Sequence, residues 1–155
     1  MNITLYQIRN DKTGRILKPG TSNSGYLSIS IIHNKIPKTH PIHRLVAKVF
    51  VPNPDAKRRV DHIDNHKTNN WATNLRWATD IEDLRNRRIF KNNKSGSKGV
   101  HWSKASQKWT AVITVNSKKI NLGFFHNKED AILIRKQRAN VEFGEYINKC
   151  EIINV

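Results

Sequence analysis

The 155-residue sequence is short of cysteine, of acidic residues and of long apolar runs. Its single cysteine, Cys150, excludes an intramolecular disulfide and a cysteine-rich zinc module, because both need several thiols. The opening stretch MNITLYQIRNDK has no apolar signal core, and no segment is apolar for long enough to span a membrane. We therefore expect an intracellular, cytoplasmic protein whose 37% hydrophobic content builds one ordinary core or two small ones.

Acidic residues are outnumbered by basic ones, 12 against 28, which gives a net charge of +16. Such an excess predicts a polyanionic partner, and nucleic acid is favoured. An anionic membrane would require a basic amphipathic helix or a lipidation site, and neither is evident. The two signs of charge are also separated: five acids lie between residues 61 and 83, whereas residues 84–128 contain eleven Lys or Arg and no acid.

The first half of the chain has strand-like alternation followed by helical spacing. GYLSISI, residues 25–31, has an apolar residue at every second position, which predicts a strand with one buried face. NLRWAT, residues 74–79, favours a second short strand, and Thr79 with Glu82 matches a capping box, so a helix should begin directly after Thr79. PIHRLVAKVF, residues 41–50, predicts a short amphipathic helix that the prolines of VPNPD end; its apolar residues at helical spacing are Leu45, Val46, Val49 and Phe50.

The second half begins with a basic, polar stretch, RNRRIFKNNKSGS, which predicts a linker over residues 85–97. KWTAVITV, residues 108–115, and KKINLGFF, residues 118–125, are joined by two residues, as in a tight hairpin. Asn127 with Asp130 can cap a last helix, which should end at a glycine, Gly144. The helix should cover an apolar sheet face made of Trp109, Ala111, Ile113, Val115, Ile120, Leu122 and Phe124.

The stretch VDHIDNHKTNN, residues 60–70, gathers carboxylates and imidazoles in this basic chain. Hydrolysis of a phosphodiester needs a base that activates water and oxygen ligands that hold a divalent cation. His62 is a candidate base beside a hard ligand, Asp61, and Asp83 is a candidate second ligand in the first turn of the following helix. Oxygen ligation fits Mg²⁺ or Mn²⁺, whereas zinc prefers His or Cys. The same residues taken alone also fit a polar turn and a carboxylate that stabilises a helix N-terminus.

The strings GYLSIS, IHRLVAKVFVPNP, VDHID, KTNN and NLRWAT, within residues 24–88, resemble the HNH homing endonucleases of phages and introns, which have a ββα-metal motif. The resemblance implies that Asp61 ligates the metal, that His62 is the general base and that Asn74 braces the loop. The last motif position, usually Asn or His, is Asp83 here, with Asn86 as a fallback ligand. His43 would be structural in this family, and Asp64 and His66 are expected to be solvated loop residues.

SGSKGVHWSKASQKWTAVITVNSKKINLGFFHNKEDAI, with FGEY further on, resembles the DNA-binding domain of ethylene-response factors (AP-two type). That family implies three antiparallel strands that read the major groove, backed by one helix. The implied DNA-facing residues are Lys98, His101, Ser103, Lys104, Lys108, Thr110, Thr114, Lys119 and Asn121. The basic residues of the linker, expected to follow the phosphate backbone, are Arg85, Arg87, Arg88, Lys91 and Lys94.

These features predict an α+β protein with an HNH nuclease domain over residues 1–84, a basic linker over 85–97 and an AP-two-like domain over 98–148. The expected function is metal-dependent, site-specific cleavage of double-stranded DNA with one Mg²⁺ or Mn²⁺ ion and no obligate small-molecule ligand. A monomer that nicks and a homodimer that cuts both strands are equally compatible with one motif. The alternative is a DNA-binding regulator that keeps the HNH scaffold with weakened catalysis; an RNA-binding protein would need exposed stacking aromatics.

Overall fold

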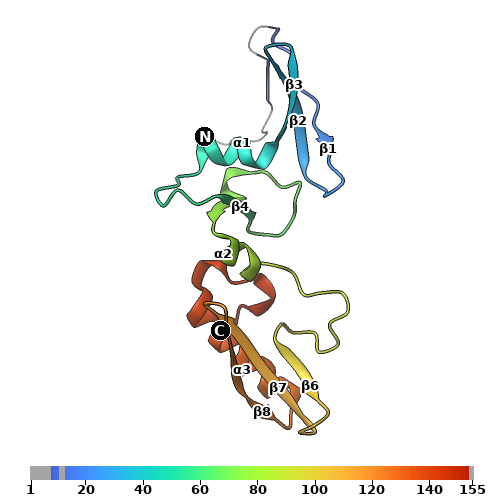
Figure 1. Ribbon diagram of the computed structural model, residues 1–155, viewed down its shortest axis with the longest axis vertical. Helices are drawn as coiled ribbons and strands as arrows, with labels where there is room; N and C mark the ends of the chain where they lie inside the picture. Colours follow the sequence, from blue (N-terminus) through green and yellow to red (C-terminus); the bar gives the residue numbers. More distant parts are fainter. Residues whose placement is uncertain (1–7, 11–12, 154–155) are drawn as a thin grey trace. The chain divides into compact units, whose positions relative to one another are not determined.

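The computed structural model describes residues 8–10 and 13–153, and it divides into two compact units between Asp83 and Leu84 (Figure 1). The expected linker therefore does not stand apart, because residues 85–97 belong to the second unit. Three of its side chains are buried there: Asn86, Ser95 and Ser97. The side-chain amide of Asn148 donates to the backbone carbonyl of Asn86, which ties the start of this segment to the end of the chain.

In the first unit, strands β1 (Gly20–Thr21), β2 (Leu27–His33) and β3 (Ile36–Pro41) form an antiparallel sheet in that order. The alternating pattern correctly predicted β2, where Ile29 is buried and Ser30 is exposed. Helix α1 (Ile42–Phe50) follows β3 directly and buries Ile42, Val46 and Ala47. It was also predicted from its spacing.

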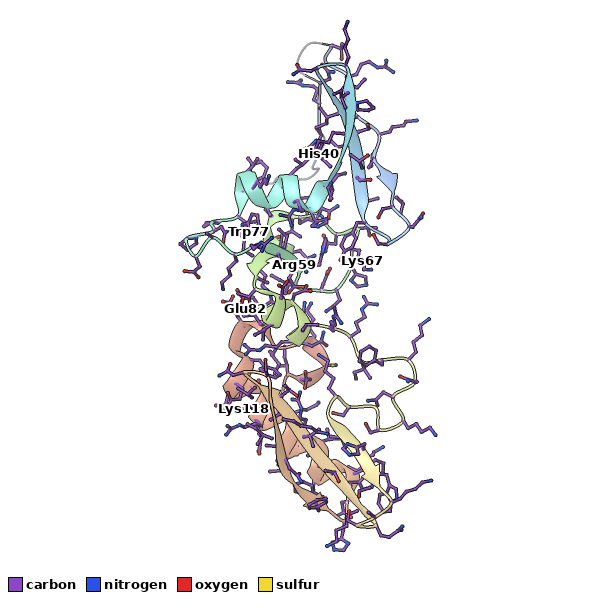
Figure 2. All side chains as sticks on the ribbon, in the orientation of Figure 1. His40, Arg59, Lys67, Trp77, Glu82 and Lys118 are labelled. Atoms are coloured by element: carbon purple, nitrogen blue, oxygen red, sulfur yellow. The ribbon has the colours of Figure 1, made fainter. Side chains whose placement is uncertain are left out.

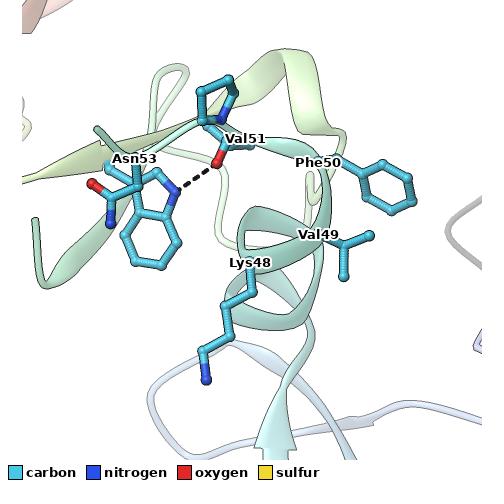
Figure 3. A pocket seen from close by; sticks show the side chains of 7 residues that line it. Lys48, Val49, Phe50, Val51 and Asn53 are labelled. Carbon is cyan, nitrogen blue, oxygen red and sulfur yellow. Dashed lines mark hydrogen bonds between the residues drawn. The ribbon is translucent and has the colours of Figure 1, made fainter. Parts of the chain in front are cut away.

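The last turn of α1 does not follow the expected apolar stripe. Val49 is 72% exposed and Phe50 is 56% exposed. Both line an open groove together with Trp77 (Figure 3). The Trp77 indole N–H donates to the carbonyl of Val51 at 3.0 Å, which closes the end of the helix.

Strands β4 (Arg59–His62) and β5 (Leu75–Ala78) pair antiparallel, and helix α2 (Asp80–Arg85) follows them. A 3₁₀ turn, Ala72–Asn74, leads into β5. The predicted capping box is confirmed: the Thr79 amide donates to Glu82 at 2.7 Å, and the Glu82 amide donates to the Thr79 hydroxyl at 3.2 Å. The core of this unit joins the three-stranded sheet, α1 and the β4–β5 pair; it consists of Ile29, Ile42, Val46, Ala47, Val60, Leu75 and Trp77.

In the second unit, β6 (Val100–Ser103), β7 (Lys108–Val115) and β8 (Lys118–Phe125) form an antiparallel sheet in sequence order. The predicted hairpin is confirmed, and both turn residues, Asn116 and Ser117, have the positive φ that a tight turn requires. Helix α3 (Lys128–Phe143) packs on the sheet, with short 3₁₀ turns at Gly144–Tyr146 and Lys149–Glu151 after it.

Two details of the second unit differ from expectation. Asn127 makes no side-chain cap bond to the backbone; its amide donates to the Asp130 carboxylate at 3.3 Å instead. In β8, Leu122 is an extra residue between Asn121 and Gly123, which pair with consecutive residues of β7. Beyond this bulge, the side chains of β8 point to the face opposite to the one that strict alternation predicts. Phe125 therefore packs in the core, and Phe124, predicted to do so, is 53% exposed.

No helix within residues 8–10 and 13–153 has the length and apolarity that a membrane span needs.

Candidate functional site

His62 is the last residue of β4 and is 4% exposed. Its Nε2 lies 2.9 Å from the side-chain oxygen of Asn70, a fully buried residue at the end of the loop. An amide oxygen accepts hydrogen bonds, so Nε2 carries the proton and the lone pair of the neutral ring is on Nδ1. The loop thus fixes the tautomer that a general base needs.

Asp61 precedes His62 and faces Arg76 across the strand pair. The Arg76 guanidinium donates to Oδ2 of Asp61 from Nε at 2.9 Å and from Nη2 at 2.8 Å, and both side chains are buried. This pair fixes the orientation of the carboxylate. Arg76 was missed in the sequence, because its role depends on the register between β4 and β5.

Asn74 braces the loop, as its motif position implied. Its side-chain oxygen accepts from the Asp64 amide at 3.1 Å, and its nitrogen donates to Asp64 Oδ1 at 2.9 Å and to the Asn69 carbonyl at 2.8 Å. Asp64 is therefore a centre of the loop and not a solvated residue. Its burial would raise its pKa, but hydrogen bonds from His66, Asn69 and Asn74 outweigh burial and hold the pKa well below the ordinary value. His66 itself is exposed, as expected.

Helix α2 is fastened beside β4 by two ion pairs, Arg59 with Asp80 and Lys57 with Glu82, the latter at 3.1 Å (Figure 2). Asp83 follows both of these carboxylates in the same helix. Burial raises the pKa of the Tyr26 hydroxyl, and the charges of Asp83 and then Asp61 raise it further. Both carboxylates therefore lie within electrostatic reach of that hydroxyl. The fallback ligand, Asn86, belongs to the second unit, where its side chain accepts a hydrogen bond from Asn148.

The donor set fits a hard divalent cation better than zinc. Within the described part of the chain, no three His, Cys, Asp or Glu side chains form a group that could hold a metal. Mg²⁺ is usually held by one or two carboxylates, with waters and phosphate oxygens completing its shell. Asp61 and Asp83 match that pattern.

Two aromatic rings, those of His43 and Tyr26, lie beside the candidate base His62. The ring of His43, from α1, lies 5.2 Å from that of His62 and 4.8 Å from that of Tyr26. His43 is 8% exposed, and its Nδ1 has no hydrogen-bond partner in residues 8–10 and 13–153. Burial, helped by the charges of His62 and Arg44, lowers the pKa of His43 to about 4. His43 is therefore neutral at neutral pH.

The second unit presents most of its predicted DNA-facing residues to solvent. Exposed on the sheet or in the basic segment are Arg87, Arg88, Lys91, Lys94, His101, Lys104, Thr114, Lys119 and Asn121, and half-buried are Ser103 and Lys108. Thr110 is 5% exposed, because its cross-strand neighbours are the larger His101 and Phe124.

Two of the basic residues expected to contact DNA have structural partners instead. Lys98 donates to the Arg85 carbonyl at 2.8 Å and pairs with Glu151 at 3.2 Å. The Arg85 guanidinium lies 4.9 Å from the centre of the Phe143 ring. Their charges therefore hold the unit together, and we leave Arg85, Lys98 and Thr110 out of the DNA-facing set.

No protein-family model matches the chain. It is 42% identical over 73 residues to the uncharacterized HNH endonuclease L245 of Acanthamoeba polyphaga mimivirus, which covers 47% of this chain and 22% of the relative. It is 37% identical over 87 residues to DNA endonuclease I-HmuI of Bacillus phage SP01 (52% and 50%) and 39% identical over 62 residues to Protein 3.8 of Escherichia phage T7 (40% and 51%). The chain thus spans about half or less of these relatives.

A solved structure, described as DNA binding and cleavage by the HNH homing endonuclease I-HmuI, matches with a TM-score of 0.50 and 26% identity. The match covers 89% of this chain and 73% of the other. It agrees with the predicted α+β class, in which small antiparallel sheets combine with few helices. Together these likenesses support a nuclease. In sequence and in fold, the chain is similar to HNH endonucleases, among them the homing endonuclease I-HmuI.

Proposed function

We propose that this protein is a metal-dependent, site-specific DNA endonuclease of the homing type, which hydrolyses phosphodiester bonds in double-stranded DNA. The observation that carries the proposal is the geometry around His62. The imidazole is held by Asn70 in the tautomer of a base, directly after Asp61 in β4 and beside Tyr26, whose hydroxyl is within electrostatic reach of Asp61 and Asp83. A basic chain with net charge +16 supplies the attraction for a polyanion.

In the proposed mechanism, His62 accepts a proton from the attacking water at Nδ1, while the Nε2–H bond to Asn70 keeps the ring in place. Asp61 and Asp83 would hold one Mg²⁺ or Mn²⁺ ion, with Arg76 fixing the Asp61 carboxylate. When bound, the cation supplies stabilisation of the negative charge on the phosphate and on the leaving 3′ oxygen. The products are 3′-hydroxyl and 5′-phosphate ends.

Asp83 stands where related motifs have Asn or His. A carboxylate keeps the oxygen ligand and adds a negative charge, which favours binding of a divalent cation. The charge of Asp83 helps to raise the pKa of Arg59, so this guanidinium partly balances it. We therefore propose that Asp83 keeps the ligand role and that activity is retained.

The outer face of the β6–β8 sheet is the proposed DNA-binding surface, in the manner of an AP-two-type domain. Its exposed residues combine a cation, a hydroxyl and an amide, which suit phosphate and base edges. The bulge adds an exposed aromatic ring, Phe124, to this face. Apolar side chains on such a face contact thymine methyl groups.

The test is a nicking assay on a supercoiled plasmid library with Mg²⁺ or Mn²⁺. We expect wild type to nick and His62→Ala to be slower by about 100- to 10,000-fold, because the base is lost. His66→Ala is the matched control, an exposed histidine in the same loop, and should nick like wild type. Binding, measured by gel shift in EDTA, should be the same for all three proteins.

Two outcomes contradict the proposal. Wild type that binds DNA and never nicks, with either metal, establishes the regulator alternative. Preference for RNA over duplex DNA excludes both the endonuclease and the regulator.

A further inference from the structure

Tyr26 reaches the candidate site from outside the β4–β5–α2 motif. It lies directly before β2, and its ring centre is 5.8 Å from that of His62 and 4.8 Å from that of His43. The ammonium group of Lys67, from the loop that contains Asn70, lies 4.9 Å from the same ring centre. Lys67 also donates to the Ser24 carbonyl at 2.8 Å, so the loop holds the segment before β2 in place. The ring is therefore fixed on two sides.

The hydroxyl of Tyr26 lies within electrostatic reach of the other half of the site. Asp83 and Asp61 are the charges that raise its pKa after burial, and Arg59 is the one that lowers it. The group is therefore a neutral O–H donor at neutral pH. Among residues 8–10 and 13–153 it has no hydrogen-bond partner in the structure, although the residue is only half-buried.

A purely structural tyrosine would bury its ring and hydrogen-bond its hydroxyl to the protein. Tyr26 buries its ring only in part, and its hydroxyl makes no hydrogen bond to residues 8–10 and 13–153. Its ring lies beside the base, and its hydroxyl lies within electrostatic reach of the carboxylates that would hold the cation. A phosphate attacked by water from the His62 side and bound on the Asp61 and Asp83 side must lie between these groups. The nonbridging oxygens of this phosphate are then the acceptors nearest to the Tyr26 hydroxyl, which lies within electrostatic reach of the two carboxylates.

We infer that the Tyr26 hydroxyl donates a hydrogen bond to a nonbridging oxygen of the scissile phosphate, which makes Tyr26 a catalytic residue of the site. The inference rests on the proposed endonuclease function. A donor fixed before the reaction stabilises the charge that develops on these oxygens, and removal of one such donor typically slows a reaction about 100-fold or more. A half-exposed hydroxyl should contribute somewhat less.

The first experiment removes only the hydroxyl. Single-turnover cleavage of a duplex that contains the mapped target should be about 10- to 100-fold slower for Tyr26→Phe than for wild type. The affinity for the duplex in EDTA and the thermal midpoint should not change, because the ring and its contacts with His43 and His62 remain. Tyr146→Phe, a buried tyrosine of the second unit, is the matched control and should cleave at the wild-type rate.

The second experiment identifies the atom. Sulfur replaces one nonbridging oxygen of the scissile phosphate in each of the two diastereomers. One diastereomer should slow wild type in Mn²⁺ and slow Tyr26→Phe by a clearly smaller factor, because the variant has already lost that contact. Equal factors for both proteins in both diastereomers overturn the inference, and so does wild-type cleavage by Tyr26→Phe.

A loss of DNA affinity or thermal stability in Tyr26→Phe that is as large as its loss of rate also overturns the inference, since it indicates a structural role. Wild type that cleaves no duplex refutes the endonuclease and this inference together. Wild type that cleaves alongside an equally fast Tyr26→Phe refutes only the role of Tyr26.

Discussion

Both units bury charged groups, but these groups have different roles in the two units. In the first unit, the buried pair of Asp61 and Arg76 leaves the carboxylate beside His62, next to a polar loop. In the second, Glu151 is 1% exposed and pairs with Arg135 at 2.6 Å as well as with Lys98, entirely inside the unit. Burial of charge is costly in both units. The first uses it to position reactive groups, and the second uses it to fasten the end of the chain to its sheet and helix.

The largest expected effect tests the chemical role of charge in the first unit. Asp61→Asn keeps an oxygen that can accept from Arg76, so the fold should hold, but it removes the anionic metal ligand. We expect cleavage to fall on the order of 1,000-fold while affinity for duplex DNA in EDTA is unchanged. Glu129→Gln is the control, since it removes one exposed carboxylate outside the site, and it should cleave DNA like wild type. Cleavage by Asp61→Asn at the wild-type rate contradicts the assignment.

The next effect tests the structural role of charge in the second unit. Glu151→Gln leaves Arg135 buried without its counter-charge, which should lower the free energy of unfolding of this unit by about 3 kcal/mol. Urea unfolding followed by tryptophan fluorescence measures the change. Glu129→Gln, on the exposed side of α3, is the control and should have almost no effect. If the two variants are equally stable, the buried ion pairs do not hold the unit together.

The third effect is a pH dependence confined to the first unit. The pKa of His43 is about 4 in the fold against an ordinary value of 6.5, so the unfolded chain binds a proton first as the pH falls. Stability from this group is therefore complete above pH 6.5, falls by about 3 kcal/mol down to pH 4, and changes no further below that. Asp64 acts in a different window, because its lowered pKa costs stability only below its ordinary value of 3.8.

Urea unfolding of wild type and His43→Gln at pH 7 and pH 4.5 isolates the contribution of His43. The variant should lose much less stability than wild type between the two pH values. His66→Gln, which replaces an exposed imidazole, should behave like wild type. Equal losses in wild type and His43→Gln show that His43 is not the titrating group.

Local signals in the sequence predicted the helices, strands and turns well. They could not predict contacts between residues that are distant in the sequence. The capping box at Thr79 and the hairpin turn at Asn116 are set by neighbouring residues, and both are confirmed. Arg76 meets Asp61 only because of a cross-strand register, and a single extra residue in β8 exchanged the places of Phe124 and Phe125.

The candidate site was predicted to a similar extent. The residue types of VDHIDNHKTNN indicated Asp61 and His62, and the family resemblance implied Asn74, because these signals lie within short stretches of sequence. Tyr26 and Asn70 have no such signal, because their positions depend on how the loop folds back onto the sheet.

The smallest expected effect tests which face of the second unit meets DNA. Lys118 and Lys119 are adjacent, exposed residues of β8 whose side chains alternate between faces, and Lys119 pairs with Thr114 on the outer face. Each lysine that contacts a phosphate releases counterions, so Lys119→Ala should reduce the slope of log affinity against log salt by about 1. Lys118→Ala, with the same change in net charge, should leave the slope almost unchanged and should cleave bound DNA at the wild-type rate. A larger change of slope for Lys118→Ala than for Lys119→Ala would place the DNA on the other side of the strand. It would contradict the proposal that the outer face of the β6–β8 sheet binds DNA.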